Sequence, residues 1–111
     1  MTREFVYLPS FLEKWSKLGL TDEDMMRLEE MLLNHPEIGA VMSGTGGIRK
    51  MRFPFGNKGK SGSSRVIYID FQMKEQVFLL DIYPKSEKSN LTKKERNELR
   101  KFVEILESRL S

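Results

Sequence analysis

The basic side chains of this sequence are concentrated between Gly44 and Arg65, in the stretch GTGGIRKMRFPFGNKGKSGSSR. Lys and Arg at this density bind phosphates and, when held in a fixed array, stabilise the extra charge of a pentacovalent phosphorus centre. The stretch therefore predicts phosphate binding, with RNA as the favoured ligand and RNA cleavage as the chemistry that this charge would support. It contains no acid and six bases, namely Arg49, Lys50, Arg52, Lys58, Lys60 and Arg65.

The spacing of the basic residues suggests how they meet. Alternation along a strand places Lys50 and Arg52 on one face, and Arg65 opens the next strand after a glycine-rich loop. Tyr83 and Lys85 lie two residues apart at the end of the last strand, so they point the same way if that strand continues. We therefore expect these side chains to converge on one side of a sheet.

Few residues are available for proton transfer. The chain has no cysteine, and its single histidine, His35, precedes Pro36 at a helix end, where a structural role is expected. No metal-ligand spacing or phosphate-binding loop is found, so the sequence predicts no metal and no cofactor. A lysine crowded by other cations has a lowered pKa and acts as a base, and Tyr83 is the candidate phenol. Tyr68 is three residues after Arg65 in the same expected strand, so if Arg65 faces the basic patch, Tyr68 is expected to face the other side.

Charge is unevenly distributed along the 111 residues, which predict one domain over 1–111. Residues 1–43 carry four bases and eight acids, residues 44–65 only bases, and residues 66–111 nine bases and eight acids. The absence of cysteine fits a reducing cytoplasm. No apolar run is long enough for a bilayer, and the N-terminus does not resemble a secretory signal, so no membrane partner is expected.

Hydrophobic periodicity and turn signals predict an α+β domain of order β-α-α-β-β-β-α. Its sheet is expected to be antiparallel, with a helical hairpin on one face and a C-terminal helix. Capping boxes are predicted at Ser10 with Glu13 and at Thr92 with Glu95. The expected strands are 5–8, 48–55, 65–72 and 77–83, and the expected helices are 10–18, 21–34 and 92–109.

The combination GTGGIRKMR, SRVIYI and FLLDIYPKSEKSNLTKKERNEL resembles the RelE/HigB family of bacterial toxins, especially its HigB-like branch. The resemblance covers nearly the whole chain in the same element order. It implies a RelE-like, microbial-ribonuclease-like fold and a type II toxin–antitoxin module. It also implies cleavage of messenger RNA in the ribosomal A site, without a metal, by attack of the ribose 2′-hydroxyl on the adjacent phosphate.

The resemblance also assigns roles by position. Arg65 corresponds to the arginine that opens the central strand, and Lys85 to the basic residue after the last strand. Lys50 and Arg52 correspond to strand cations that hold RNA, and Lys58 and Lys60 fall in a loop expected near RNA. Several family members carry a catalytic tyrosine where this chain has about Leu91, so Tyr83 or a lysine would have to substitute.

The predicted site therefore comprises Arg65, Lys85, Tyr83 and Lys50 as catalytic residues, with Arg49, Arg52, Lys58 and Lys60 binding RNA. The expected partners are a cognate antitoxin of helix-turn-helix type, the ribosome and messenger RNA. Operator DNA is expected to be contacted only through the antitoxin. Two alternatives are a noncatalytic RNA- or partner-binding module, such as a degenerate toxin, and a small structural domain with a basic edge.

Overall fold

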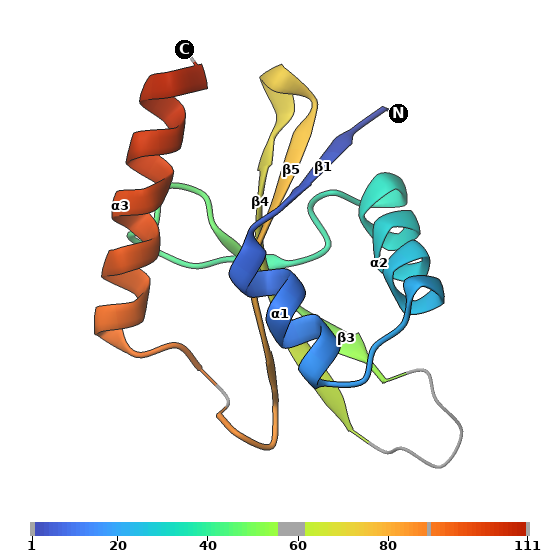
Figure 1. Ribbon diagram of the computed structural model, residues 1–111. Coiled ribbons are helices and arrows are strands. Elements are labelled where there is room, and N and C mark those ends of the chain that lie inside the picture. Colours follow the sequence, from blue (N-terminus) through green and yellow to red (C-terminus); the bar gives the residue numbers. More distant parts are fainter. Residues whose placement is uncertain (1, 56–61, 89, 111) are drawn as a thin grey trace.

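The computed structural model describes residues 2–55, 62–88 and 90–110, which form one five-stranded sheet with three α-helices (Figure 1). In chain order the elements are β1 (Glu4–Tyr7), α1 (Pro9–Lys17), α2 (Asp22–Asn34), β2 (Ala40–Val41), β3 (Arg49–Pro54), β4 (Ser63–Phe71), a 3-10 turn (Gln72–Lys74), β5 (Gln76–Pro84) and α3 (Lys93–Leu110). All the predicted elements are present, and the two-residue strand β2 is an addition to them.

The sheet has the order β1-β5-β4-β3-β2. The pairs β2–β3, β3–β4 and β4–β5 are antiparallel as predicted, whereas β1 runs parallel to β5. The prediction of a wholly antiparallel sheet is therefore wrong for the first strand. Because β1 and β5 are far apart in the chain, no hairpin turn fixes their relative direction, and sequence alternation does not reveal it.

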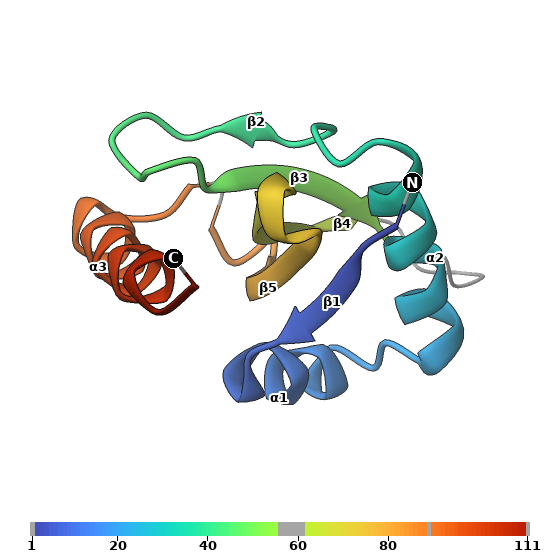
Figure 2. The same cartoon turned by 90° about the horizontal axis from the view of Figure 1, so that it is seen from above.

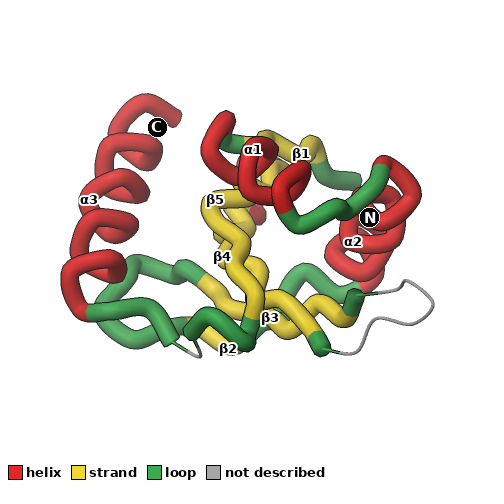
Figure 3. The backbone as a smooth tube through the Cα atoms, turned by 60° about the horizontal axis from the view of Figure 1, so that its bottom comes forward, coloured by secondary structure: helices red, strands yellow, loops and turns green. Residues whose placement is uncertain are grey.

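The sheet lies between α3 on one side and α1 and α2 on the other (Figures 2 and 3). We call the side covered by α1 and α2 the hairpin face, and the opposite side the α3 face. Each face has its own apolar core, because successive side chains of a strand point to opposite faces. Thus Val66 and Tyr68 of β4 belong to the hairpin-face core, whereas Ile67 and Ile69 belong to the α3-face core.

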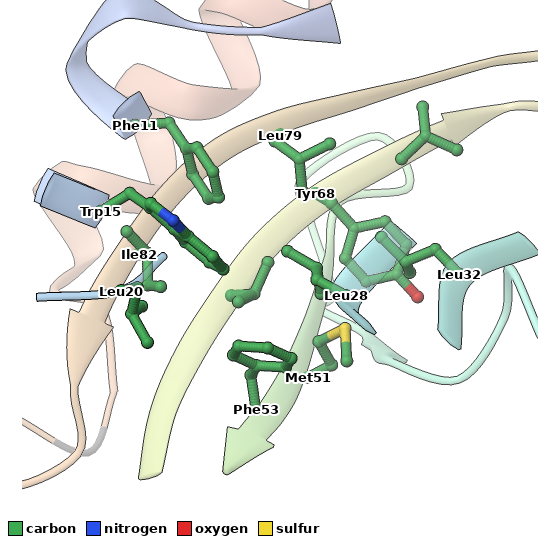
Figure 4. Packing of buried hydrophobic residues seen from close by; sticks show 12 residues of the cluster. Phe11, Trp15, Leu20, Leu28, Leu32, Met51, Phe53, Tyr68, Leu79 and Ile82 are labelled. Atoms are coloured by element: carbon green, nitrogen blue, oxygen red, sulfur yellow. The ribbon is translucent and has the colours of Figure 1, made fainter. Parts of the chain in front are cut away.

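Aromatic rings hold α1 against the hairpin face of the sheet (Figure 4). The ring of Trp15 lies 5.7 Å from that of Phe11 and 5.7 Å from that of Phe53 of β3, centroid to centroid. Leu28 and Leu32 of α2 are fully buried in the same core. The predicted helical hairpin therefore covers one face, as expected.

The helix starts follow the capping signals only in part. The box at Thr92 and Glu95 is confirmed, since Thr92 N–H donates to Glu95 Oε1 at 2.9 Å and Glu95 N–H to Thr92 Oγ1 at 3.1 Å. The box predicted at Ser10 is wrong, because α1 begins at Pro9 with Leu8 as its N-cap and no side-chain cap. Proline suits the first helical position, where its missing N–H is not needed.

The glycine-rich segment before β3 is a tight turn that joins β2 to β3. Gly44 and Gly46 have φ of 75° and 79°, a conformation that favours glycine. Between them Thr45 is buried, where its hydroxyl donates to Met42 O at 2.6 Å and accepts from Ile48 N–H at 3.1 Å. These glycines therefore set the start of β3 and do not bind phosphate as a loop would.

The C-terminal helix packs on the α3 face as the predicted stripe requires. Val103 is fully buried, and Leu99, Phe102 and Leu106 pack around it. Leu91, just before the helix, is only 7% exposed and joins the same core. The start of α3 is therefore fixed against the sheet by both an apolar anchor and the capping box.

Candidate nucleic-acid interface

Three of the predicted residues form a row across three neighbouring strands. Arg52 of β3 lies directly opposite Arg65 of β4, and Arg65 lies directly opposite Tyr83 of β5. Alternation places the row on the α3 face, since Met51, Phe53 and Val66 point into the hairpin-face core. The structure therefore brings together side chains that are up to 31 positions apart in the sequence.

The centre of this row is arranged at a cost to stability. Like charges directly opposite one another on a sheet are destabilising, and here two arginines are directly paired. The buried Nε of Arg65 and the buried hydroxyl of Tyr83 have no hydrogen-bond partner among the described residues. An anion bound beside Arg65 would reduce the repulsion between the two arginines and would accept a hydrogen bond from the Nε of Arg65.

Lys85 extends the row toward the end of the sheet. Its N–H donates to Ser63 O at 2.9 Å, so the β4–β5 pairing continues past Pro84. Arg52 Nε donates to the hydroxyl of Ser63 at 3.2 Å. Beside them is an open hollow of about 430 Å³, which we call the Lys85 hollow; it is lined by Arg52, Phe55, Gly62, Ser63, Lys85 and Ser86.

Lys50 lies on the same face of β3 as Arg52 but contributes to a different hollow. Its Nζ donates to Asn90 Oδ1 at 2.6 Å, in the segment that leads into α3. This second hollow, of about 340 Å³, is called here the Asn90 hollow; it is lined by Met42, Lys50, Asn90, Leu91 and Arg96. Among the described residues no acid lines either hollow, so both offer hydrogen-bond donors and positive charge to a ligand.

Tyr83 is buried, with only 3% of its surface exposed. Lys88 covers it, with Nζ 4.9 Å from the ring centroid, and pairs with Glu95 at the start of α3. Burial raises the pKa of Tyr83, although Arg65 partly offsets the rise, so the phenol stays protonated at neutral pH. In this arrangement Tyr83 lies directly opposite Arg65 on the neighbouring strand, with its hydroxyl buried. A catalytic contact of that hydroxyl stays a prediction.

Glu95 pairs with the lysine that covers Tyr83, but it is a weak base. Its hydrogen bond with Lys88 and that with Thr92 N–H lower its pKa below the usual value, because both donors stabilise the carboxylate. Its oxygens are occupied by these two donors. Glu95 therefore positions Lys88 over Tyr83 and is a poor candidate for proton abstraction.

Arg49 does not join the other cations. Alternation puts it on the face opposite to Lys50 and Arg52, where its guanidinium donates to Gly39 O at 2.7 Å and to Glu37 O at 3.2 Å. The structure therefore gives Arg49 an anchoring role and separates it from the RNA-binding set predicted for it. Lys58 and Lys60 lie outside the described residues.

The other candidates for acid–base chemistry are structural or remote from the row. Tyr68 is fully buried in the hairpin-face core, where its hydroxyl donates to Pro36 O at 2.7 Å and accepts from Gly39 N–H at 2.9 Å. Burial raises its pKa. His35 caps the C-terminus of α2, as expected for a structural histidine. No group of three or more potential metal ligands occurs among the described residues.

Sequence reasoning missed four residues of this surface. Ser63 and Asn90 bond to the predicted cations Arg52 and Lys50, and Lys88 and Arg96 border the same face. In the sequence, Lys88 and Arg96 are charged residues of a loop and of a helix, and such residues are usually exposed to solvent. Only the packing of α3 against the sheet places them beside the other cations.

Comparison with known proteins gives a family and solved structures of similar fold. A family model described as the RelE toxin of the RelE/RelB toxin–antitoxin system matches residues 6–110. The solved structure of an arginine double mutant of E. coli toxin RelE, in the free state, superposes with a TM-score of 0.55 and 18% sequence identity. The match covers 80% of this chain and 90% of the E. coli chain, and it supports the fold.

No helix in the described part of the chain combines the length and apolar character needed to cross a membrane.

Proposed function

Since this chain belongs to the RelE toxin family, we propose that it is a ribosome-dependent endoribonuclease that cuts messenger RNA without a metal. The observation that carries the proposal is the row of Arg52, Arg65 and Tyr83, in which two arginines are directly paired and the buried Arg65 Nε lacks a partner among the described residues. This arrangement lowers stability and favours a bound phosphate, which is expected of a site kept for function.

The proposed reaction is internal transfer of the phosphoryl group. The ribose 2′-oxygen forms a bond to phosphorus, the bond from phosphorus to the 5′-oxygen breaks, and a 2′,3′-cyclic phosphate remains. The 2′-hydroxyl proton leaves to solvent, and the 5′-oxygen takes up a proton. Because the nucleophile belongs to the substrate, the protein's task is to hold the phosphate and stabilise its added charge.

Arg65 and the two cations of the Lys85 hollow, Arg52 and Lys85, each have a distinct place in this scheme. Arg65, at the centre of the row, would donate to the nonbridging phosphate oxygens through its planar fork. Arg52 lies opposite it and shares the added charge. Lys85 lines the hollow and, unlike arginine, can release a proton, so we assign it to the leaving 5′-oxygen.

The proposed biological setting follows from the family. A cognate antitoxin, of helix-turn-helix type, would neutralise the protein and carry any contact with operator DNA. The target would be messenger RNA on the ribosome, in the cytoplasm. Assignment to the HigB-like branch of the family remains a prediction.

The direct test is cleavage of messenger RNA on programmed ribosomes, with chemical analysis of the new ends. Wild type is expected to produce fragments that end in a cyclic phosphate and begin with a 5′-hydroxyl, and Arg65→Ala to produce none. Arg100→Ala is the matched control, since Arg100 lies on α3 and pairs with Glu104. Intact message with wild type, or equal cleavage by Arg65→Ala, would overturn the proposal.

A noncatalytic RNA-binding module is the second candidate, and the burial of the Tyr83 hydroxyl favours it. That function predicts RNA binding that weakens with salt, and no cyclic phosphate ends in the same experiment. The end analysis therefore separates the two candidates in one measurement.

A further inference from the structure

We propose that the Asn90 hollow is a second phosphate-binding subsite, in which Arg96, Lys50 and Asn90 hold the backbone of a nucleotide next to the one that is cut. The inference rests on the proposed function, because it assumes that the Lys85 hollow takes the scissile phosphate. In this proposal Arg96 of α3 and Asn90 of the preceding segment bind RNA together with residues of the strands.

The two hollows are placed for one strand of RNA. Lys50 and Arg52 are two residues apart on one face of β3, so their Cα atoms are separated by roughly 7 Å. Arg52 lines the Lys85 hollow and Lys50 lines the Asn90 hollow. A strand whose scissile phosphate lies beside Arg65 would therefore place a neighbouring phosphate close to Lys50.

The chemistry of the Asn90 hollow fits an anion. An ammonium group has no acceptor, so Asn90 must turn its oxygen toward Lys50 Nζ and leave its NH₂ donors free for a ligand. Arg96 adds a guanidinium whose side chain makes no hydrogen bond or ion pair with the described residues. Met42 and Leu91 add apolar walls against which a ribose or base would pack.

The position of Arg96 is fixed by the fold. Arg96 N–H donates to Thr92 O at 3.0 Å in the first turn of α3, next to the Thr92–Glu95 capping box. Leu91 is 7% exposed and anchors the segment that carries Asn90. The backbone that carries the donors of this hollow is therefore held in place before RNA arrives, which reduces the ordering cost of binding.

Several other arginines of the chain pair with an acid, whereas Arg96 pairs with no acid that the structure describes. Arg3 pairs with Asp70, Arg27 with Asp24 and Arg100 with Glu104. Arg96 is half-buried in a hollow that no acid lines among the described residues. A partly buried guanidinium without a counter-ion is unfavourable, and this favours the binding of an anion beside Arg96.

The test compares binding of two RNA oligonucleotides that cannot be cut because every 2′-hydroxyl is methylated. A dinucleotide carries one phosphate and reaches one hollow, whereas a hexanucleotide reaches both. Fluorescence anisotropy would measure the Kd of each with wild type, Arg96→Ala and Asn90→Asp. The last variant keeps the side-chain shape and places a carboxylate beside Lys50. Lys94→Ala, an exposed lysine in the same turn of α3, is the matched control.

We expect Arg96→Ala and Asn90→Asp to weaken hexanucleotide binding about 10-fold and dinucleotide binding less than twofold, with Lys94→Ala unchanged. Equal weakening of both oligonucleotides, or of neither, by the two variants would overturn the second subsite. Failure of wild type to bind either oligonucleotide would instead contradict RNA binding itself, and with it the proposed function. A thermal melt of each variant would show that its fold is retained.

Discussion

On the hairpin face, the cationic side chains are used to hold the protein together. Arg27 lies 4.2 Å above the ring of Phe53 and donates to Pro54 O at 3.0 Å, and Arg49 donates to two carbonyls of the segment before β2. On the α3 face of the same strands, Arg52 and Arg65 are directly paired, and no acid among the described residues lines the hollow beside Arg52.

The difference teaches that cation density alone does not identify an RNA-binding surface. Arg49 and Lys50 are adjacent in the sequence, yet one bonds to backbone carbonyls and the other opens onto a hollow. What distinguishes the two faces is that cations of the α3 face border hollows that no acid lines among the described residues. We expect substitutions on the α3 face to change activity, and those on the hairpin face to change stability.

The largest effect is expected at Arg65. Arg65→Lys keeps the positive charge but loses the planar fork, so we expect kcat on programmed ribosomes to fall by about 10²-fold. The free energy of unfolding should stay about the same, because lysine keeps the like charge opposite Arg52. A variant that unfolds more easily, or that keeps wild-type kcat, would contradict the assignment.

The reverse pattern is expected at Arg49. Arg49→Ala removes charged hydrogen bonds to Gly39 O and Glu37 O, so the free energy of unfolding should decrease by about 2 kcal/mol. RNA affinity should remain within twofold of wild type at temperatures where the variant is folded. Urea denaturation and anisotropy would measure the two quantities, with Arg100→Ala as the control for loss of a surface arginine. A large loss of RNA affinity without a loss of stability would break the comparison.

A smaller effect is expected from the capping box of α2. The hydrogen bond from Thr21 N–H, followed by those from the Thr21 hydroxyl and Arg27, lowers the pKa of Asp24 below its usual 3.8. Because the folded-state pKa is the lower one, the stabilisation is present above pH 3.8 and is lost as the pH falls through the folded value.

Asp24→Asn keeps an oxygen acceptor but cannot titrate. Its free energy of unfolding should therefore vary less than that of wild type between about pH 5 and pH 2. Chemical denaturation at several pH values would show this. Identical pH profiles for the two proteins would mean that Asp24 does not contribute.

The smallest effect is expected at Tyr83. Since its hydroxyl is buried and has no partner among the described residues, Tyr83→Phe should retain kcat within a few-fold and be at least as stable as wild type. A 100-fold loss of kcat would show that the phenol is catalytic and that Lys88 moves away from it during the reaction.

Much of the fold could be predicted from the sequence, because its signals are local. Alternation along β3 placed Met51 and Phe53 on one face and Lys50 and Arg52 on the other. The apolar stripe of α3 placed Val103 in a core. The parallel direction of β1 could not be predicted, since no turn links it to β5. The Ser10 capping signal failed because Pro9 already provides a good first residue for α1.

The candidate site was predictable where it depends on strand parity and not where it depends on packing. Arg52, Arg65 and Tyr83 share a face because their positions alternate correctly along neighbouring strands. The burial of Tyr83 results from Lys88 and from the start of α3, which are set by tertiary contacts. Asn90 and Arg96 belong to no sequence motif, and tertiary contacts also set their positions. They could therefore be identified only from the structure.

The central claim is that the α3 face binds RNA phosphates through Arg52 and Arg65, neither of which pairs with an acid among the described residues. Its most direct test is the salt dependence of RNA binding. The Kd of the uncut hexanucleotide would be measured across a range of salt concentrations for wild type, for the Arg52→Gln/Arg65→Gln double variant and for Arg49→Gln. We predict that the slope of log Kd against log salt decreases by about 1.4 in the double variant, at about 0.7 for each lost phosphate contact, and is unchanged in Arg49→Gln. Equal slopes for wild type and the double variant, or a reduced slope for Arg49→Gln alone, would contradict the account.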